Sequence, residues 1–403
     1  MRIAINALLL NVPDTGSGQY IAHLLRALAA RDDDNEYVLL YGERPSPPAP
    51  LPTRERGALS PRRGGVRFRR LMVHSPFHDR HAGLDKVWWE QVSFPRACVR
   101  ASADVAHVPY FASSLWPRVP TVVTVLDLIP LILPEYRTSA LVRLYTDLAA
   151  RSVCRATRII TISKWSKRDV MRLLGVPAER VRVIYLAADE RFRPVDDPAI
   201  LADLRARYGL AEQFILYLGG FDARKDVATL VRAFAAARDE LPGWQLIIAG
   251  RVHEDSPLFP DPRPVARELG LRVVEAPARD PAAGVVFTGR ISEADKPLFY
   301  SAADIFAFPS RYEGFGLDPL EALACSAPVV CSNATSLPEV VGDAALLVSP
   351  GDVRGFAAAL VRVATDDALH ADLSARGPAQ AARFSWARTA EQTLAVYRSV
   401  SNQ

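Results

Sequence analysis

The 403-residue sequence has little cysteine and little net charge, and each shortage excludes a class of protein. Its four cysteines, Cys98, Cys154, Cys325 and Cys331, form no C-x-x-C pair and share no spacing pattern with histidines. A zinc site is therefore not expected, and the simplest interpretation is free thiols in a reducing compartment. The net charge of +4 is too small to indicate a nucleic-acid partner, and no zinc-finger or RNA-binding aromatic motif is present.

Long apolar runs are missing as well. The longest candidate, residues 122–133, is interrupted by Asp127 and Pro130 and falls short of the roughly 20 apolar residues that span a bilayer. Residues 1–10 carry an early arginine and no cleavage site, which predicts a strand rather than a signal peptide. We therefore expect a soluble cytoplasmic protein, with a peripheral position at the inner face of the cell membrane as the alternative.

The length of the chain and a repeated pattern indicate two domains. One hydrophobic core usually stops growing at roughly 250–300 residues. Short β-branched runs alternate here with helical patterns, which predicts parallel sheets covered by helices. The expected strands are residues 3–8, 37–40, 66–70, 105–108, 121–125, 158–162, 214–218, 245–249, 285–288, 305–308 and 328–331. The expected helices are residues 19–30, 84–99, 139–154, 164–174, 226–237, 293–301, 319–324, 353–365 and 386–399.

The pattern breaks and restarts at residues 189–209, where Arg193-Pro194 and Asp197-Pro198 interrupt it. We predict an α/β protein with two Rossmann-like, doubly wound domains, residues 1–190 and 191–383, facing each other across a cleft. The helix in residues 384–403 would cross back and pack on the first domain. Open α/β sheets bind ligands at the carboxyl ends of their strands, so the cleft is the expected site.

One segment departs from globular composition. Prolines cluster in residues 44–61, and residues 54–70 contain seven arginines against one glutamate. The simpler interpretation is a solvated loop. The alternative is a peripheral membrane contact or an acidic acceptor, since each basic residue near an anionic lipid surface adds about 1 kcal/mol.

The most informative motif runs from Pro309 to Leu323. It follows the apolar run 305–308 and opens a predicted helix, with Glu313 in the loop and Glu321 eight positions later in the helix. The glycines on either side of Phe315 let a ligand approach the backbone, and the first amides of the helix are available donors. Carboxylates in such a turn can accept hydrogen bonds from sugar or ribose hydroxyls. The alternative is that Glu313 and Glu321 lie at the start of a helix without binding a ligand.

A second motif, Gly219-Gly220-Phe221-Asp222-Ala223-Arg224-Lys225-Asp226, also links a predicted strand to a helix. Two glycines, two cations and a helix N-terminus together predict a diphosphate site. The turn Thr15-Gly16-Ser17-Gly18-Gln19 follows the first strand in a similar way, but short Gly-Ser loops are common.

These motifs resemble the family-4 nucleotide-sugar glycosyltransferases of the GT-B fold, in particular their mannosyltransferase-like branch. The likeness extends over nearly the whole chain. It includes the Gly16 turn, Gly219-Gly220 with Arg224-Lys225, and above all the Glu313-x7-Glu321 spacing. Further matching segments are Asp104-Val105-Ala106-His107-Val108-Pro109, Thr161-Ile162-Ser163-Lys164, Val181-Arg182-Val183-Ile184, Pro328-Val329-Val330, Pro338-Glu339-Val340 and Gly342-Asp343-Ala344-Ala345.

The resemblance implies a role for each matching position. Arg224 and Lys225 would grip the diphosphate and offset the charge on the leaving nucleotide, while Glu313 would hold hydroxyls of the donor sugar. Glu321 would take the ribose diol. The expected catalytic residues are Arg224, Lys225, Glu313 and Asp127. The expected donor-binding residues are Gly16, Gly219, Gly220, Arg224, Lys225, Arg290, Ile291, Glu313, Gly314, Phe315, Gly316, Leu317 and Glu321.

Neither a metal nor a cofactor is expected beside the donor sugar nucleotide. The sequence has no Asp-x-Asp motif of the kind that carries magnesium in other transferases, and preorganised cations and helix amides can stabilise the departing diphosphate by several kcal/mol. A two-carboxylate glycosidase would leave the Arg224-Lys225 pair without a purpose. Retention of anomeric configuration follows from the family alone.

The chain departs from the family pattern at Leu126, which occupies the position of a histidine commonly found before Asp127. Asp127 either contacts donor or acceptor or caps a turn. His107 either replaces the missing group or is a partly buried histidine with a backbone partner. Ser326 replaces a usual glycine, which would cost about 1 kcal/mol if this backbone has positive φ.

We therefore expect a retaining transferase that moves a mannose- or glucose-type hexose to a glycan, lipid-linked or small-molecule acceptor. GDP-mannose and UDP-hexoses are the first donors to test. One alternative is a subunit that binds sugar nucleotides without chemistry, for which Leu126 is the support. Another is a sugar-nucleotide 2-epimerase, which the complete set of motifs around Glu313 and Glu321 disfavours.

Overall fold

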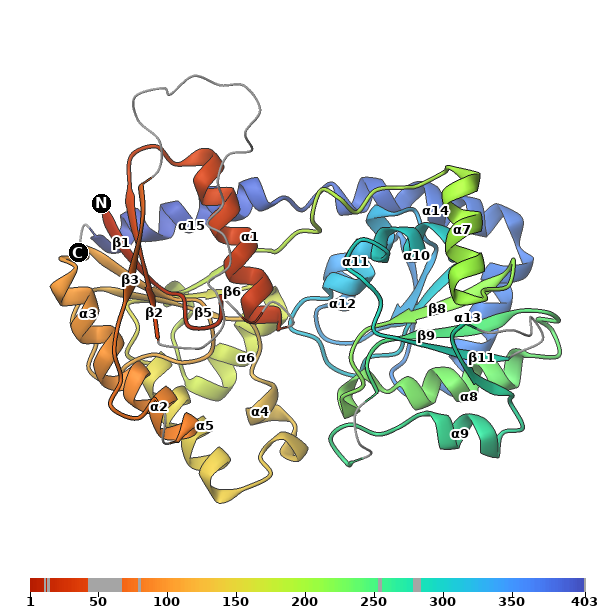
Figure 1. Ribbon diagram of the computed structural model, residues 1–403, viewed down its shortest axis with the longest axis horizontal. Coiled ribbons are helices and arrows are strands. Elements are labelled where there is room, and N and C mark those ends of the chain that lie inside the picture. Colours follow the sequence, from red (N-terminus) through yellow and green to blue (C-terminus); the bar gives the residue numbers. More distant parts are fainter. Residues whose placement is uncertain are drawn as a thin grey trace. The chain divides into compact units, whose positions relative to one another are not determined.

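The computed structural model describes residues 1–10, 12, 15–42, 67–78, 81–252, 256–277 and 284–401. The chain divides into two compact units (Figure 1). Unit 1 comprises Met1–Leu186 and Ser385–Gln403, and unit 2 comprises Ala187–Phe384. The proline-rich residues 44–61 and most of the basic segment 54–70 lie outside the described residues, and only residues 67–70 of that segment are described, as part of a strand.

Unit 1 is built on a seven-stranded parallel sheet in the order β3-β2-β1-β4-β5-β6-β7. Helices cover both of its faces, which is the doubly wound arrangement predicted from the alternating pattern. The strands are β1 (Arg2–Asn6), β2 (Glu36–Tyr41), β3 (Arg67–Met72), β4 (Val105–Val108), β5 (Thr121–Val125), β6 (Arg158–Thr161) and β7 (Val181–Val183). The helices are α1 (Gly16–Arg31), α2 (Ala82–Trp88), α3 (Phe94–Arg100), α4 (Ile129–Ile132), α5 (Ala140–Val153), α6 (Lys164–Leu174) and α15 (Trp386–Ser401).

Unit 2 is also built on a seven-stranded parallel sheet, in the order β10-β11-β9-β8-β12-β13-β14, but here β11 lies between β9 and the edge strand β10. Its strands are β8 (Phe214–Leu218), β9 (Gln245–Ala249), β10 (Val273–Glu275), β11 (Val285–Gly289), β12 (Ile305–Phe308), β13 (Val329–Ser332) and β14 (Ala345–Val348). Its helices are α7 (Pro198–Tyr208), α8 (Val227–Ala237), α9 (Arg263–Glu268), α10 (Lys296–Ala302), α11 (Leu317–Ala324), α12 (Leu337–Val341), α13 (Val353–Thr365) and α14 (Asp367–Ala381).

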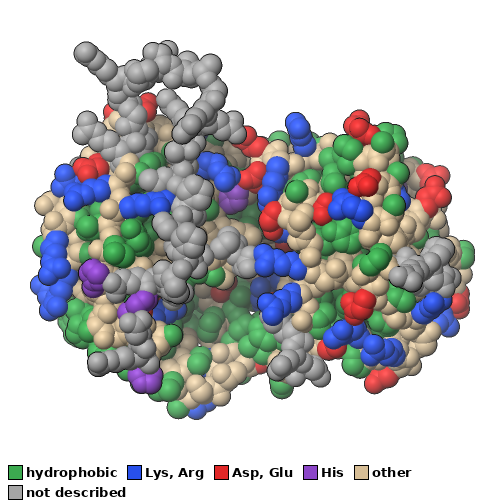
Figure 2. Space-filling view, viewed as in Figure 1, with side chains coloured by type: hydrophobic (Ala, Val, Ile, Leu, Met, Phe, Trp, Pro, Cys, Tyr) green, Lys and Arg blue, Asp and Glu red, His purple; other side chains and the backbone are tan. Residues whose placement is uncertain are grey.

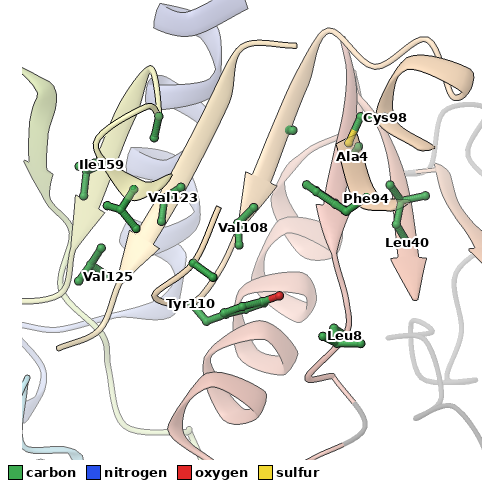
Figure 3. Close-up of a cluster of buried hydrophobic side chains, with 14 of the residues drawn as sticks. Ala4, Leu8, Leu40, Phe94, Cys98, Val108, Tyr110, Val123, Val125 and Ile159 are labelled. Carbon is green, nitrogen blue, oxygen red and sulfur yellow. The ribbon is translucent and has the colours of Figure 1, made fainter. Parts of the chain in front are cut away.

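The two faces of the unit 1 sheet carry different side chains because successive residues of a strand point to opposite faces. One face is an apolar core in which alternate strand residues pack on α3 (Figure 3). Its members include Ala4, Leu8, Leu40, Phe94, Cys98, Val108, Val123, Val125 and Ile159. The opposite face holds His107 and Thr124, which are both fully buried.

The C-terminal helix packs on unit 1, as predicted. Within α15, Tyr397 reaches His107 of β4 and Glu391 pairs with Arg31 of α1 at 2.9 Å. Thr389 donates a hydrogen bond to the carbonyl of Tyr185 at 2.6 Å. The last helix therefore covers the first sheet although the whole of unit 2 separates the two in sequence.

Two helix predictions were wrong in detail. Residues 198–209 were predicted to belong to the join, but α7 begins at Pro198 because proline suits the first helical position. The Asp197 side chain caps this helix by accepting from the amide of Ala199 at 2.9 Å. The single helix predicted for residues 84–99 is instead α2 and α3, joined by a π-helical turn at Trp89–Ser93.

The surface and the thiols agree with the composition. The face of unit 2 seen in Figure 2 intersperses lysine and arginine with aspartate and glutamate. None of the helices in the described part of the chain is long and apolar enough to cross a membrane. All four cysteines are free thiols.

Candidate functional site

The candidate site of unit 2 lies where two neighbouring strands end. β8 pairs with β9 on one side and with β12 on the other, so the connections that follow β8 and β12 lead to opposite sides of the sheet. Ligands of open α/β sheets bind at the carboxyl ends of strands at such a switch point. The loops that follow these two strands are the motifs around Gly219 and Glu313.

The loop after β8 places two cations. It continues with Gly219 and Gly220, makes a 3₁₀ turn over Ala223–Lys225 and reaches α8 through Asp226. The φ of Asp226 is 48°, in the left-handed region that residues other than glycine rarely adopt. The turn is held by Tyr217, whose hydroxyl donates to the carbonyl of Gly220.

The loop after β12 is held by hydrogen bonds to the hydroxyl side chains of Thr335 and Ser336. The amide of Glu313 donates to Thr335 at 2.9 Å, and the hydroxyl of Ser336 donates to the carbonyl of Glu313 at 2.9 Å. Gly316 begins the turn into α11 with a φ of 116°, and a side chain there would lie 2.7 Å from Leu337. Neither Thr335 nor Ser336 was predicted as a site residue, because they lie more than 20 residues further along the chain.

The two loops meet in a buried ion cluster. Oε1 of Glu313 lies 2.7 Å from Nη1 of Arg224 and 2.9 Å from Nζ of Lys225. Ser310 also donates to this oxygen, at 2.7 Å. Burial would raise the pKa of Glu313, but Arg224 and Lys225 together lower it to about 2. The structure therefore brings together three of the four predicted catalytic residues, with both cations charged and preorganised.

The same cluster contains carboxylates beside Glu313. Asp222 pairs with Nε of Arg224 at 2.9 Å, and Asp318 pairs with Nζ of Lys225 at 3.2 Å. Burial would lower the pKa of Lys225, but Glu313 and Asp318 outweigh it and raise that pKa. Sequence reasoning did not assign a role to Asp318, although it stands inside the quoted motif.

Glu321 lies two residues beyond Pro319 on α11 and has a different environment. Its nearest described partner is the hydroxyl of Tyr300, 3.4 Å from Oε2. Burial raises the pKa of Glu321 to about 8, and the charge of Asp318 acts in the same direction. This carboxyl is therefore largely protonated at neutral pH, unlike Glu313.

The remaining predicted donor residues lie along the same edge of the sheet. Gly289 ends β11 with a φ of 66°, Arg290 is exposed, and Ile291 is buried. The amide-bearing residues Gly314, Phe315 and Gly316 are buried, and Leu317 begins α11. Phe315 packs edge-on against Phe384, with ring centroids 5.7 Å apart. Their contact with a donor remains a prediction.

Gly16 and Asp127 belong to unit 1. Gly16 is the first residue of α1 and has open space where a side chain would stand, whereas a side chain at Gly18 would collide with the carbonyl of Val12 at 2.1 Å. Close packing therefore requires glycine at position 18 rather than 16. The carboxylate of Asp127 accepts from the amide of Ile129 at 3.2 Å, which is the turn-capping contact considered from sequence.

His107 does not have the backbone partner that the simpler interpretation predicted. Its Nδ1 lies 2.6 Å from the hydroxyl of Tyr397, and its Nε2 lies 2.8 Å from Oγ1 of Thr124. Both partners are side chains, and the ring is fully buried. Burial lowers the pKa of His107 to about 3, so the ring is neutral. These contacts tie β4 and β5 to α15.

Comparisons with known proteins place the chain in a family. A model described as "Glycosyltransferase Family 4" matches residues 15–192, and one described as "Glycosyl transferases group 1" matches residues 212–366. The O-antigen chain mannosyltransferase B of Escherichia coli is 32% identical over 96% of both chains. The chain therefore belongs to glycosyltransferase family 4 and is mannosyltransferase-like.

Solved structures agree on the fold. Sucrose-phosphate synthase from Thermosynechococcus elongatus aligns with a TM-score of 0.73 at 24% identity, covering 99% of this chain and 98% of that one. Anabaena HepE, solved in complex with UDP and glucose, aligns with a TM-score of 0.68 at 18% identity over 99% and 100% of the chains. The predicted GT-B fold is thus confirmed, and the protein is a glycosyltransferase.

Proposed function

We propose that the chain is a retaining, metal-independent hexosyltransferase that uses a nucleotide diphosphate sugar. The observation that carries this proposal is the pairing of half-buried Arg224 and buried Lys225 with Glu313 at the switch point of the sheet. Two charged donors and the N-terminal amides of α11 converge on one small region, which is what a diphosphate requires. The relative from Escherichia coli is a mannosyltransferase, which makes GDP-mannose the first donor to test.

In the proposed reaction the bond between C1 of the sugar and the β-phosphate oxygen breaks, and the nucleoside diphosphate leaves with the electron pair. Arg224 and Lys225 receive the charge that develops on the phosphate oxygens. Because both cations are already held by carboxylates, they need no reorganisation at the moment of reaction. Glu313 would orient them and hold hydroxyls of the sugar. The acceptor hydroxyl then forms the new bond to C1 on the same face and passes its proton to the departing β-phosphate oxygen.

The acceptor is proposed to be a glycan or a lipid-linked saccharide, with small molecules as the further class. The mannosyltransferase relative acts on an O-antigen chain by its name, which supports a glycan. We further propose a cytoplasmic location, with a peripheral contact at the inner face of the membrane through residues 54–70.

The test is release of GDP or UDP from GDP-mannose, UDP-glucose and UDP-galactose, with EDTA present and with glycan or lipid extracts as acceptors. Wild type, Glu321→Gln and Arg232→Gln are compared, because Arg232 is an exposed cation on the neighbouring α8. One donor should be consumed by wild type and Arg232→Gln. At pH 8.5, where Glu321 is mostly ionised, loss of the charged hydrogen bonds of about 1.5–3 kcal/mol should weaken donor binding by Glu321→Gln about ten- to hundredfold.

Each part of the proposal has its own contrary result. Activity that EDTA abolishes would overturn metal independence, and a product of inverted configuration by proton NMR would overturn retention. Equal donor affinity of Glu321→Gln would exclude the ribose role.

A binding subunit without chemistry is the second candidate. It is favoured by Leu126 together with the buried position of His107, whose contacts with Thr124 and Tyr397 leave it no role as a substitute. Binding of a donor without nucleotide release under every acceptor condition would select this candidate.

A further inference from the structure

Asp318 is the second carboxylate that pairs with Lys225, which already pairs with Glu313. It is the second residue of α11, and its Oδ2 lies 3.2 Å from Nζ of Lys225. The side chain of Lys225 is 7% exposed, and that of Asp318 is 27% exposed. The ion pair therefore reaches from the buried cluster to the solvent side of the site.

The cluster does not need Asp318 for neutrality. Asp222 and Glu313 already provide one carboxylate for each of the two cations, Arg224 and Lys225. With Asp318 included, these five groups carry one net negative charge. A site intended for a diphosphate would bind it more tightly without this additional acid, since like charges at close range oppose binding.

The position of this carboxylate coincides with the parts proposed to hold the phosphates. A side chain added at Gly219 would lie 3.7 Å from Oδ2 of Asp318, so the carboxylate stands over the Gly219-Gly220 turn. It also belongs to the first turn of α11, whose dipole favours an anion. Asp318 thus pairs with Lys225 and lies at the N-terminus of α11, the two groups that an incoming phosphate would use.

The donor and the nucleotide product of a glycosyltransferase differ in the charge on the β-phosphate. The sugar diphosphate carries two negative charges, whereas the free nucleoside diphosphate carries nearly three at pH 8 because the second pKa of a terminal phosphate is about 6. The additional charge lies on the β-phosphate, the group that Lys225 would bind. A fixed carboxylate beside Lys225 therefore disfavours the product more than the donor.

We propose that Asp318 competes with the diphosphate for Lys225 and thereby biases the site toward the donor sugar nucleotide and against the free nucleoside diphosphate. The residue acts through Lys225 and is a positioning and selectivity residue rather than a catalytic one. This inference rests on the proposed function, because it requires that Lys225 binds the diphosphate.

The experiment is isothermal titration calorimetry at pH 8 with UDP, GDP, UDP-glucose and GDP-mannose as probes. Asp318→Asn removes the charge and keeps the size. Asp239→Asn is the matched control, because the side chain of Asp239 is 94% exposed and lies beyond the end of α8. Asp318→Asn should tighten binding of the free nucleotide about tenfold and of its sugar derivative about threefold, and Asp239→Asn should change neither.

The ratio of the two affinities separates selectivity from a structural role. Loss of a charge near a helix N-terminus lowers thermal stability in either case, but it does not alter the preference between product and donor. Unchanged or equally changed affinities in Asp318→Asn would overturn this inference and leave the proposed function intact. Failure of wild type to bind any of the four probes would overturn the proposed function, and the inference with it.

A kinetic readout completes the test. If one donor is consumed, the inhibition constant of the released nucleotide should fall about tenfold in Asp318→Asn, in step with its tighter binding. An inhibition constant that stays at the wild-type value would contradict the role of Asp318 in product release.

Discussion

Both units are built on seven-stranded parallel sheets, but buried titratable side chains such as His107 tend to be neutral in unit 1, whereas those of the ion cluster are charged in unit 2. In unit 1, burial lowers the pKa of His107 to about 3 and raises that of Glu90 to about 7, so both tend toward the neutral form. In unit 2, ion pairing outweighs burial, lowering the pKa of Glu313 to about 2 and raising that of Lys225. The difference arises from the balance between burial and ion pairing. Burial dominates at His107 and at Glu90, where it outweighs Lys86 and the hydroxyl partners, whereas ion pairs dominate at Glu313 and Lys225.

This contrast indicates what each buried group contributes. A neutral, fully bonded network such as that of His107 with Thr124 and Tyr397 costs little to bury and holds elements together. A buried charge cluster is a poor stabiliser, because desolvation offsets most of the attraction. Its presence at the switch point of unit 2 is more readily explained by ligand binding than by stability.

The largest effect is expected from removing one cation of unit 2. In Lys225→Met, the leaving diphosphate loses a preorganised charge, so kcat/KM should fall about 10²- to 10³-fold. The methionine retains most of the packing on Phe308, whose ring lies 4.5 Å from Nζ. The measurement is initial-rate kinetics with the donor identified in the release assay.

Arg232→Gln again serves as the control for loss of one positive charge on this unit. It should retain wild-type kcat/KM. A loss smaller than about threefold in Lys225→Met would show that the cluster of unit 2 is structural, as in unit 1, and would remove the contrast.

The corresponding change in unit 1 should affect stability. His107→Leu removes the shared partner of Tyr397 and Thr124, of which Thr124 keeps its contact with the hydroxyl of Tyr20 at 3.1 Å, and should cost about 1–3 kcal/mol of unfolding free energy. Urea unfolding followed by tryptophan fluorescence reports chiefly on unit 1, which contains five of the six tryptophans, namely Trp88, Trp89, Trp116, Trp165 and Trp386.

The exposed His81 provides the control, and His81→Leu should leave the urea midpoint unchanged. The sign of the pH effect is also fixed. Unfolded His107 takes up a proton below about pH 6.5 and the folded residue does not, so its contribution declines as the pH falls from about 6.5 toward 3. Equal midpoints for His107→Leu and wild type would contradict the interpretation of this network.

Glu321 is the exception in unit 2, because its pKa is raised to about 8 as in a neutral buried group. Ribose hydroxyls would donate to the ionised carboxylate, so binding must release its proton at neutral pH. Affinity for the donor should therefore rise about twentyfold between pH 6.5 and 8.5 and then level off. Calorimetry in buffers of different ionisation enthalpy measures the proton released.

Glu321→Gln cannot release a proton and should bind with an affinity that is constant over this range. The folded state also holds this proton where an unfolded glutamate has lost it, so the contribution of Glu321 to stability falls as the pH rises from about 4.5 to 8. A wild-type affinity independent of pH would remove Glu321 from the ribose site.

The meeting of Glu313 with Arg224 could be predicted from sequence because both follow parallel strands at their carboxyl ends. Strands that are buried on both faces, such as β8 and β12, are also continuous apolar runs that are easily recognised. The predicted donor loops therefore lie along one edge of the sheet.

What could not be predicted depends on contacts distant in sequence or on short elements. Tyr397 meets His107 across 290 residues, and no local pattern marks that pair. The strands β7 and β10 are only three residues long and were not predicted. The charge states of Glu313 and Glu321 depend on which partners surround them, although the two share one motif.

The smallest effect concerns backbone strain, which also distinguishes the units. Four described non-glycine residues have positive φ, and only Ser102 belongs to unit 1. In unit 2, Asp226 and Thr335 lie in the loops that hold the ion cluster, where strain accompanies function. Ser326 also has a positive φ, of 63°, but makes no described contact with the ion cluster. The strain at this position therefore has no part in holding the site.

Ser326→Gly should therefore stabilise unit 2 by about 0.5–1 kcal/mol, because glycine adopts this conformation without steric cost. The gain is measured as an upward shift in the thermal unfolding of unit 2, with donor affinity unchanged. Ser326→Ala is the matched control, since it removes the hydroxyl but keeps the β-carbon, and it should give no gain. Equal stabilisation by both variants would trace the cost to the hydroxyl rather than to the positive φ. Loss of donor affinity in Ser326→Gly would instead show that strain at this position, like that at Asp226 and Thr335, supports the site.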